Sequence, residues 1–322
     1  MDTYKPPFEI TSKITDFLVK IGGELVRLEG LTGNSLAPHL RRGNRIRTIQ
    51  ASLEIEHNTL TIEQVTDVIE GKPVIGLPHE ILEVQNTFAV YEKIESFDPY
   101  SSIDLLNAHR LLMDNLVALS GEWRTGGVGV VKGKEVVHMA PPASNVPRLM
   151  NDLLSWLRQT DVHPLIASCV FHYELEFIHP FADGNGRMGR LWQTVILSAW
   201  NSAFSWIPVE TLVRDRQQEY YDVLAACDRS GDSTLFIEFM LEALLHSCGG
   251  VNGGVNGGVN DLHKKILDLL DKADNPLRAN SIAEKLNTSQ RSVERAIQQL
   301  KKEQRIYFSG APKTGGYIVI RS

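Results

Sequence analysis

Hydrophobic positions recur at helical spacing through most of the first 248 residues. The spacing predicts helices over residues 103–119, 146–157, 166–177, 187–200 and 215–226. The third of these should stop near His179-Pro180, because a residue that precedes proline is disfavoured in the right-handed helical region. A β pattern occurs at residues 128–131 and 136–138, joined by residues 132–135, and predicts a small hairpin. The expected fold of this part is therefore mainly α.

A second apolar stripe lies upstream and contains a carboxylate. The stripe steps by three, four and seven residues through Ile46, Ile49, Leu53 and Leu60. Glu56 falls on the same face, where burial of an unpaired carboxylate costs several kcal/mol. Either the helix ends near His57-Asn58 and Glu56 reaches solvent, or Glu56 has a buried partner.

The repeat GGVNGGVNGGVN, residues 249–260, is too rich in glycine for a packed element and predicts a flexible linker. Beyond it, helical patterns precede two strand signals, at residues 262–270, 281–286, 289–303, 306–308 and 317–320. This order is typical of a winged helix-turn-helix domain. The chain is thus expected to comprise an N-terminal helical region, a core, a linker and a winged-helix domain, at residues 1–100, 101–248, 249–260 and 261–322.

Composition places the chain among globular proteins, with 43% hydrophobic and 22% charged residues. The apolar runs are too short to span a bilayer, and the first residues lack the pattern of a secretory signal. Cys169, Cys227 and Cys248 are too widely spaced for a zinc site or a disulfide framework. A reducing cytoplasm is the expected compartment, with no membrane partner.

The net charge of −6 is unevenly distributed, because residues 261–322 hold 12 Lys and Arg against 7 Asp and Glu. The first turns of the third tail helix offer Gln290, Arg291 and Arg295 to a DNA major groove, and Lys313 lies at the tip of the wing. DNA binding is therefore one hypothesis for the tail. Recruitment of a target protein and formation of a homodimer are the alternatives.

Residues 177–190 concentrate polar side chains between two predicted helices. The backbone of Gly184-Asn185-Gly186 can converge on an anion, and a helix that begins at Arg187 adds the positive end of its dipole. Arg187 and Arg190 are three residues apart and share a face of the first turn. Cations there oppose the dipole, so their placement favours an anion clamp over stability.

Asp183 and His179 extend this chemistry. Asp183 would repel a phosphate unless it held Mg²⁺, and His179 can accept a hydroxyl proton near neutral pH. A surface turn is the simple alternative, since Asp-Gly and Asn-Gly are strong turn dipeptides. The EF-hand and Walker A patterns do not fit the sequence. Together the residues favour a phosphate-binding catalytic loop.

The twelve residues HPFADGNGRMGR, His179 to Arg190, resemble the Fic family signature HPFx(D/E)GNGRxxR at every defined position. The resemblance extends over roughly residues 35–245. It implies a Fic-type helical fold with a hairpin flap. It also implies a nucleotidyltransferase that uses ATP and Mg²⁺ to transfer AMP to a Ser, Thr or Tyr hydroxyl of a target protein or of itself.

The resemblance also implies residue roles. His179 would deprotonate the target hydroxyl, Asp183 would hold Mg²⁺, and Phe181 would anchor the loop. The implied ATP and phosphate contacts are Gly184, Asn185, Gly186, Arg187, Met188, Gly189 and Arg190, with Arg190 on the γ-phosphate.

Further roles fall outside the loop. The flap residues Val136, Val137 and His138 would dock the target by strand addition. Tyr220 and Asp228 occupy positions that contact the nucleoside in similar proteins. The alternatives are that Tyr220 belongs to the core and that Asp228, which replaces a commoner Asn, does not bind.

Ser52 to Glu56 resembles the inhibitory motif (S/T)xxxE(G/N) of Fic proteins. The resemblance implies that Glu56 pairs with Arg190 in the space of the γ-phosphate and that Ser52 orients the helix. His57 departs from the motif, although Asn58 follows. The hypothesis is an autoinhibited AMP transferase. A DNA-binding regulator with a nucleotide-sensing domain, and an enzyme that removes AMP, remain alternatives.

Overall fold

The structure is a computed structural model that describes residues 4–31, 37–127, 129–132, 135–254, 265–271, 273, 276–286, 288, 290–302, 305–310 and 315–319. The chain separates into two compact units, Met1–Cys248 and Gly249–Ser322. Among the helices so described, none is long and apolar enough to cross a membrane.

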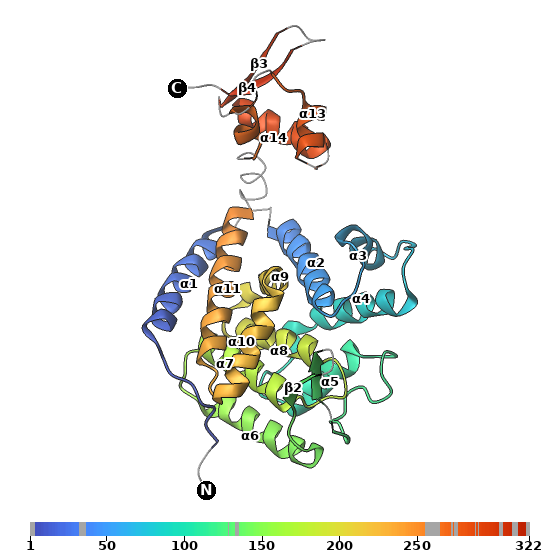
Figure 1. Ribbon diagram of the computed structural model, residues 1–322, viewed down its shortest axis with the longest axis vertical. Coiled ribbons are helices and arrows are strands. Elements are labelled where there is room, and N and C mark those ends of the chain that lie inside the picture. The colour runs from blue at the N-terminus through green and yellow to red at the C-terminus, as the bar shows by residue number, and fades with distance from the viewer. Residues whose placement is uncertain are drawn as a thin grey trace. The chain divides into compact units, whose positions relative to one another are not determined.

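The first unit is built from helices around α7 and α8, which pack against each other (Figure 1). Its helices are α1 (Ser12–Leu31), α2 (Ala37–Ile55), α3 (Ile62–Ile69), α4 (Pro78–Tyr91), α5 (Ser102–Leu112), α6 (Val146–Gln159), α7 (Pro164–Ile178), α8 (Asn185–Trp200), α9 (Val209–Asp215), α10 (Gln217–Ser230) and α11 (Thr234–Gly254). Short 3-10 turns occur at Ile94–Ser96, Ala143–Asn145 and Ser202–Ser205. In Figure 1, α2, α3 and α4 lie together on one side of this unit, and α1 and α11 on the other.

The helices α7 and α8 place the polar loop between them. α7 is buried along most of its length, as expected for an apolar core helix, and ends at Ile178 as its sequence predicts. His179 adopts a left-handed conformation with φ 52° and ψ 59° rather than an extended one. α8 begins two residues earlier than predicted, so Asn185 and Gly186 belong to its first turn.

Two other predicted helices have different bounds. α5 ends at Leu112, so the prediction of helix to residue 119 is wrong for its last turns. The cause is the turn-forming pair Asp114-Asn115, in which Asn115 has φ 56°. α10 begins two residues later and ends four residues later than the predicted range, residues 215–226.

The C-terminal end of α2 satisfies both interpretations of Glu56. The N–H of Asn58 donates to Leu53 O (3.1 Å) and that of His57 to Glu54 O (3.0 Å), a Schellman motif with His57 at φ 69°. The helix therefore ends as the simpler interpretation requires, and Glu56 nevertheless has a partner. Leu60 is buried, but in the segment after the helix rather than on its stripe.

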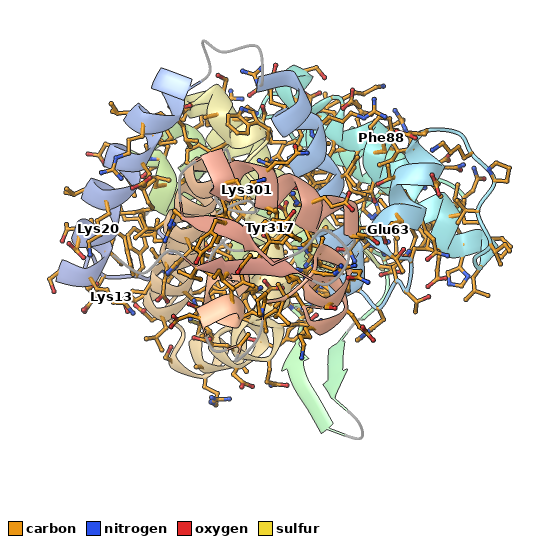
Figure 2. All side chains as sticks on the ribbon, turned by 90° about the horizontal axis from the view of Figure 1, so that it is seen from above. Lys13, Lys20, Glu63, Phe88, Lys301 and Tyr317 are labelled. Atoms are coloured by element: carbon orange, nitrogen blue, oxygen red, sulfur yellow. The ribbon has the colours of Figure 1, made fainter. Side chains whose placement is uncertain are left out.

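The hairpin consists of antiparallel strands β1 (Gly129–Lys132) and β2 (Glu135–Met139) and projects from the helical unit (Figure 2). Val131 pairs with Val136 and Val130 with His138, so Val137 forms a bulge. Residues 133–134 of the turn lie outside the described residues, as do the side chains of Val136, Val137 and His138.

The second unit contains a helical segment at residues 265–271, α13 (Ala279–Lys285), α14 (Gln290–Lys302) and antiparallel strands β3 (Ile306–Ser309) and β4 (Gly316–Val319). Its core is made by Ile266, Leu270, Ile282, Ala283, Val293, Ala296, Ile297, Leu300 and Ile306. A helix-turn-helix with a two-stranded hairpin follows, which confirms the predicted fold class.

The glycine-rich repeat, predicted as a flexible linker, is helical in its first half. α11 continues through Gly254, so the first half of the repeat is helical, and residues 255–260 lie outside the described residues. An existing helix extends by one hydrogen bond per added residue without a new nucleation cost, which offsets the poor propensity of glycine.

Candidate functional site

The loop between α7 and α8 is closed by its own side chains. Asn185 Oδ1 accepts from the Phe181 N–H and Asn185 Nδ2 donates to Phe181 O, both at 2.9 Å. Phe181 is fully buried and stacks on His109 with ring centroids 3.7 Å apart. The side-chain amide of Asn185 therefore shapes the loop, and the backbone N–H of this residue is one of the first donors of α8.

His109 supports the loop from α5, a role that the sequence did not indicate. Its Nδ1 accepts from the Gly121 N–H at 2.8 Å, which leaves Nε2–H to donate to Asp183 O at 3.1 Å. Burial, with a further contribution from the nearby Arg187 charge, lowers the pKa of His109 to about 4. The imidazole is thus neutral near pH 7, as this tautomer requires.

Arg124 is a second support that the sequence did not indicate. Its buried guanidinium donates to four backbone carbonyls, those of Gly126, Pro141, Ile178 and His179, at 2.5–3.3 Å. Two of these carbonyls end α7 and two flank the hairpin. One side chain therefore joins both ends of the hairpin to the base of the loop.

His179 is partly exposed at the end of α7. Its Nδ1 lies 3.2 Å from Glu176 O. If Nδ1 carries the proton and donates to that carbonyl, Nε2 has the lone pair that a general base needs.

The N-terminus of α8 is suited to an anion. Gly184 caps the helix with φ 81°, and a β-carbon there would lie 2.7 Å from Met113 Sδ, so this position requires glycine. The N–H groups of Asn185, Gly186 and Arg187 have no partner within the helix. They point out of its N-terminus, which is the positive end of the helix dipole. A helix end of this kind binds phosphate or carboxylate.

Met188 and Gly189 face the core instead. The Met188 N–H donates to Gly184 O at 2.9 Å and its side chain is fully buried, so neither group is available for a phosphate. A β-carbon at Gly189 would lie 2.6 Å from His172 Cδ2. Gly189 thus permits the close approach of α7 and α8, which corrects its assignment and that of Met188 to ATP contact.

Arg190 is buried and bound by the end of α2. Its Nη2 donates to Glu56 Oε1 at 2.8 Å and to Ser52 O at 3.0 Å, and its Nε donates to Ser52 Oγ at 3.3 Å. Burial opposes the charge of Glu56, but Arg190 outweighs it and holds the pKa of Glu56 below its ordinary value. The pair that the sequence predicts is therefore formed and ionised.

The Glu56 carboxylate also lies over the first turn of α8. A β-carbon at Gly186 would come within 2.6 Å of Glu56 Oε1 and 3.1 Å of Arg190 Nη1. Only glycine leaves room for this approach. Glu56 thus lies at the helix end that favours an anion.

Arg187 has different partners. Its Nη1 lies 3.1 Å from Glu83 Oε1 on α4, and its Nη2 lies 3.6 Å from Asp183 Oδ1. Glu83 was not identified from the sequence, because it is 104 residues away and α4 contains no motif.

Asp183 lies at the solvent edge of the loop, with its side chain 62% exposed. Its Oδ1 accepts from the Gly184 N–H at 2.6 Å. Among the described residues, no group of three or more His, Cys, Asp or Glu could hold a metal. One carboxylate is nevertheless the donor set that Mg²⁺ uses when substrate phosphates and water complete its shell.

The two residues assigned to nucleoside contact have other partners. Tyr220 is 1% exposed and its hydroxyl lies 3.1 Å from His172 Nε2, so it occupies the core, as the alternative held. Its neighbour Tyr221 is 41% exposed. Asp228 Oδ1 accepts from the Tyr173 hydroxyl at 3.1 Å.

In the tail, Gln290 is exposed at the start of α14 and donates to Glu294 at 2.8 Å. Arg291 and Arg295 belong to the same helix, but their side chains lie outside the described residues. Lys313 also lies outside them.

Comparison with known proteins matches both units. Residues 99–197 match the Fic/DOC family and residues 263–318 match an HTH domain. The crystal structure of a Fic family protein from Desulfovibrio desulfuricans G20 has 46% identity, covers 99% of each chain and gives a TM-score of 0.75. A structure of Fic-1 from C. elegans, at 22% identity and a TM-score of 0.62, shares the fold over 76% of this chain and 74% of its own.

Curated relatives are more distant. "Protein adenylyltransferase Fic" of Nematostella vectensis is 29% identical over 208 residues, which are 60% of this chain and 45% of that protein. The protein of the same name from Aedes aegypti is 28% identical over 61% of this chain and 40% of its own. The chain thus spans less than half the length of these two relatives.

Proposed function

The chain belongs to the Fic/DOC family and has a C-terminal HTH domain, and we propose that it is a protein adenylyltransferase inhibited by its own Glu56. The observation that carries the proposal is the start of α8, where the first backbone N–H groups have no partner within the helix and Arg187 and Arg190 lie in the first two turns. Distant similarity to protein adenylyltransferases supports the same reaction.

In the proposed reaction, the N–H groups of Asn185, Gly186 and Arg187 bind the phosphates of ATP. His179 Nε2 accepts the proton of the target hydroxyl, whose oxygen attacks the α-phosphorus. The bond from that phosphorus to the oxygen bridging to the β-phosphate breaks, and pyrophosphate leaves. Arg187 and Arg190 stabilise the negative charge that moves onto this leaving group.

Asp183 is the residue that would hold Mg²⁺. Its exposed carboxylate beside the anion site fits an ion that keeps water and shares phosphate oxygens. When bound, Mg²⁺ neutralises phosphate charge. The proposed cofactors are therefore ATP, as the donor, and Mg²⁺.

The β1–β2 hairpin is the proposed docking site for the target segment. It projects from the unit, and a projecting strand offers backbone groups for strand addition (Figure 2). Arg124 joins the hairpin to the carbonyl of His179, so a docked strand would lie in a fixed relation to the base.

Inhibition follows from competition between two anions. The Glu56 carboxylate lies at the N-terminus of α8 and on Arg190, both of which the terminal phosphate of ATP would need. We expect weak basal activity that rises when Glu56 is removed.

The test incubates the full chain with Mg²⁺ and ATP labelled on the α-phosphate, alone and with a cell lysate. We expect Glu56→Gly to raise incorporation of label by about tenfold or more, because a charge-assisted contact contributes roughly 1.5–3 kcal/mol. His179→Ala should abolish incorporation. Glu54→Gly is the matched control, since Glu54 is exposed two residues earlier on α2 and bonds Gln50 and Arg214.

Label that does not depend on His179 would contradict the proposed base. Equal labelling by the Glu56→Gly and Glu54→Gly variants would contradict inhibition by Glu56. Loss of label from a pre-modified target, if it requires Glu56, would identify AMP removal as the activity instead.

The HTH match supports a second role for the tail, the binding of duplex DNA. In that role α14 enters the major groove with Gln290, Arg291 and Arg295, and Lys313 contacts phosphate. A shift assay on the full chain tests it. We expect Arg291→Ala with Arg295→Ala to weaken DNA binding and to flatten its salt dependence. Unchanged binding, or none by the wild type, would leave protein docking or dimer formation.

A further inference from the structure

We propose that Glu83 is a positioning residue for Arg187, holding its guanidinium so that the unpaired Nε–H meets a phosphate of ATP. The inference deepens the proposed function and rests on it. Glu83 touches neither the reacting atoms nor, in this role, the nucleotide, and it acts through Arg187.

Arg187 is held mainly by Glu83. The arginine side chain is 6% exposed and that of Glu83 16%, and their contact measures 3.1 Å. The second acid, Asp183, is 62% exposed and 3.6 Å away, so water screens it more strongly. Glu83 therefore determines where the guanidinium points.

Glu83 is itself fixed. Asn58 Nδ2 donates to Glu83 Oε2 at 2.8 Å, while Glu83 Oε1 accepts from Arg187. Asn58 is buried and also donates to Glu80 O at 3.2 Å, and its Oδ1 accepts from the Leu60 N–H at 3.1 Å. Both oxygens of the carboxylate thus have defined donors, as positioning requires.

The unused donor of Arg187 points to a ligand. Its Nε is buried and, among the described residues, has no hydrogen-bond partner. A guanidinium is a rigid fork of five N–H donors, and an unpaired buried donor is costly. Because Arg187 is the third residue of α8, this fork lies at the helix end that favours an anion.

The two arginines therefore differ in state. Arg190 Nε donates to Ser52 Oγ and its Nη2 is bound by Ser52 and Glu56, so the end of α2 uses these donors. Arg187 donates from Nη1 to Glu83 and has Asp183 3.6 Å from Nη2, while its Nε has no hydrogen-bond partner among the described residues. Glu56 competes with a phosphate, whereas Glu83 prepares the site for one.

The direction in which one substitution changes the Kd for ATP distinguishes a positioning role of Glu83 from a second inhibitory role. Glu83→Gln, placed in the Glu56→Gly background, removes the charge but retains the shape and an oxygen acceptor. We expect the Kd for ATP with Mg²⁺, measured by equilibrium dialysis, to rise about tenfold because a charge-assisted contact that orients Arg187 is lost. The Kd for adenosine, which has no phosphate, should not change.

Kinetics supply the second readout. If Arg187 binds phosphate equally in the ground and transition states, Glu83→Gln raises KM for ATP and leaves kcat nearly unchanged. Glu83→Asp keeps the charge and should recover part of the affinity. Glu63→Gln is the matched control, because Glu63 is an exposed acid on the neighbouring α3 (Figure 2).

Each outcome decides the assignment. Tighter ATP binding by Glu83→Gln would make Glu83 a second inhibitor and overturn positioning. Equal losses for ATP and adenosine would show general disruption and overturn it as well. ATP binding without transfer of AMP would contradict the proposed function, and the Kd comparison would still decide the role of Glu83. If the Glu56→Gly variant did not bind ATP, the proposed function and the positioning role of Glu83 would both be contradicted.

Discussion

The loop of residues 177–190 is held on two sides by different chemistry. On the side of the core, Phe181 stacks on a neutral His109, and Arg124 binds backbone carbonyls. On the side of α2 and α4, Glu56 and Glu83 bind Arg190 and Arg187 through charged contacts.

The difference has a consequence for ligand binding. A phosphate can replace a carboxylate on a guanidinium, because both are anions that accept from the same donors. It cannot replace the stack of Phe181 or the carbonyls that Arg124 binds. The core side therefore sets the shape of the loop, and the side of α2 and α4 governs the charge that an incoming anion meets.

The largest expected effect comes from a substitution on the core side of the loop. Arg124→Met leaves four carbonyls without their donor, at roughly 1–3 kcal/mol for each that stays dry, so we expect a loss of about 4 kcal/mol in the free energy of unfolding. Urea unfolding measures it. Arg148→Met, at an exposed arginine, should change stability by less than about 0.5 kcal/mol. A loss under 1 kcal/mol for Arg124→Met, roughly that of an ordinary substitution, would show that these carbonyls find other donors.

A pH series separates the two sides. The folded protein keeps His109 neutral down to a pKa of about 4, whereas the unfolded chain binds the proton near 6.5. Stability should therefore fall as pH drops from about 6.5 to 4, by about 3 kcal/mol for this group. Against the effect of burial, the charge of Arg190 lowers the pKa of Glu56 below its ordinary value, so this carboxylate takes up its proton at a lower pH than an unpaired glutamate.

The measurement compares wild type with His109→Gln by urea unfolding across that pH range. The variant should show a shallower fall, although buried His172, with a pKa of about 3, adds a slope to both proteins. Parallel curves for the two proteins would mean that His109 is not held neutral.

Gly186→Ala tests the other side. The added carbon would lie 2.6 Å from Glu56 Oε1, and overpacking of this kind costs about 1–3 kcal/mol. Combining it with Glu56→Gly should recover part of the loss. Gly43→Ala on α2, where nothing lies within 4 Å, should stabilise the chain by up to about 1 kcal/mol. Purely additive losses in the double variant would argue against the contact.

The smallest effect concerns the turn that presents Glu56. His57 has φ 69°, a conformation that costs a residue with a side chain about 1 kcal/mol relative to glycine. His57→Gly should therefore stabilise the protein by about that amount, seen as a higher urea midpoint. Asn115→Gly, at φ 56°, should gain less because asparagine tolerates this region. Destabilisation by His57→Gly would show that the imidazole makes a contact of its own.

Much of the loop could be predicted from sequence because its residues are contiguous. The order of His179, Asp183, Arg187 and Arg190 brings them to one helix start once α7 stops before Pro180. The pairing of Glu56 could also be predicted, since a carboxylate on an apolar stripe requires a partner. The side chains that support the site were not.

Those supports could not be predicted for physical reasons. Glu83, His109 and Arg124 are common residue types, and tertiary packing alone brings them to the loop. The apolar spacing predicted too long a helix α5, because the spacing continues past Asn115, where the backbone turns. The resemblance assigned nucleotide contacts to Tyr220 and Met188 from their positions in the sequence. Both side chains are buried, and that burial depends on how α7, α8 and α10 pack.

The place of Glu56 directly after the last turn of α2 gives the proposed inhibition an adjustable threshold. In that proposal, the residue at position 57 sets how firmly the helix terminates, and hence how much free energy an arriving nucleotide would have to supply to displace the carboxylate. Related chains could set different thresholds by exchanging this one residue, with the loop and both arginines unchanged. Sensitivity to ATP would then evolve separately from the chemistry of transfer.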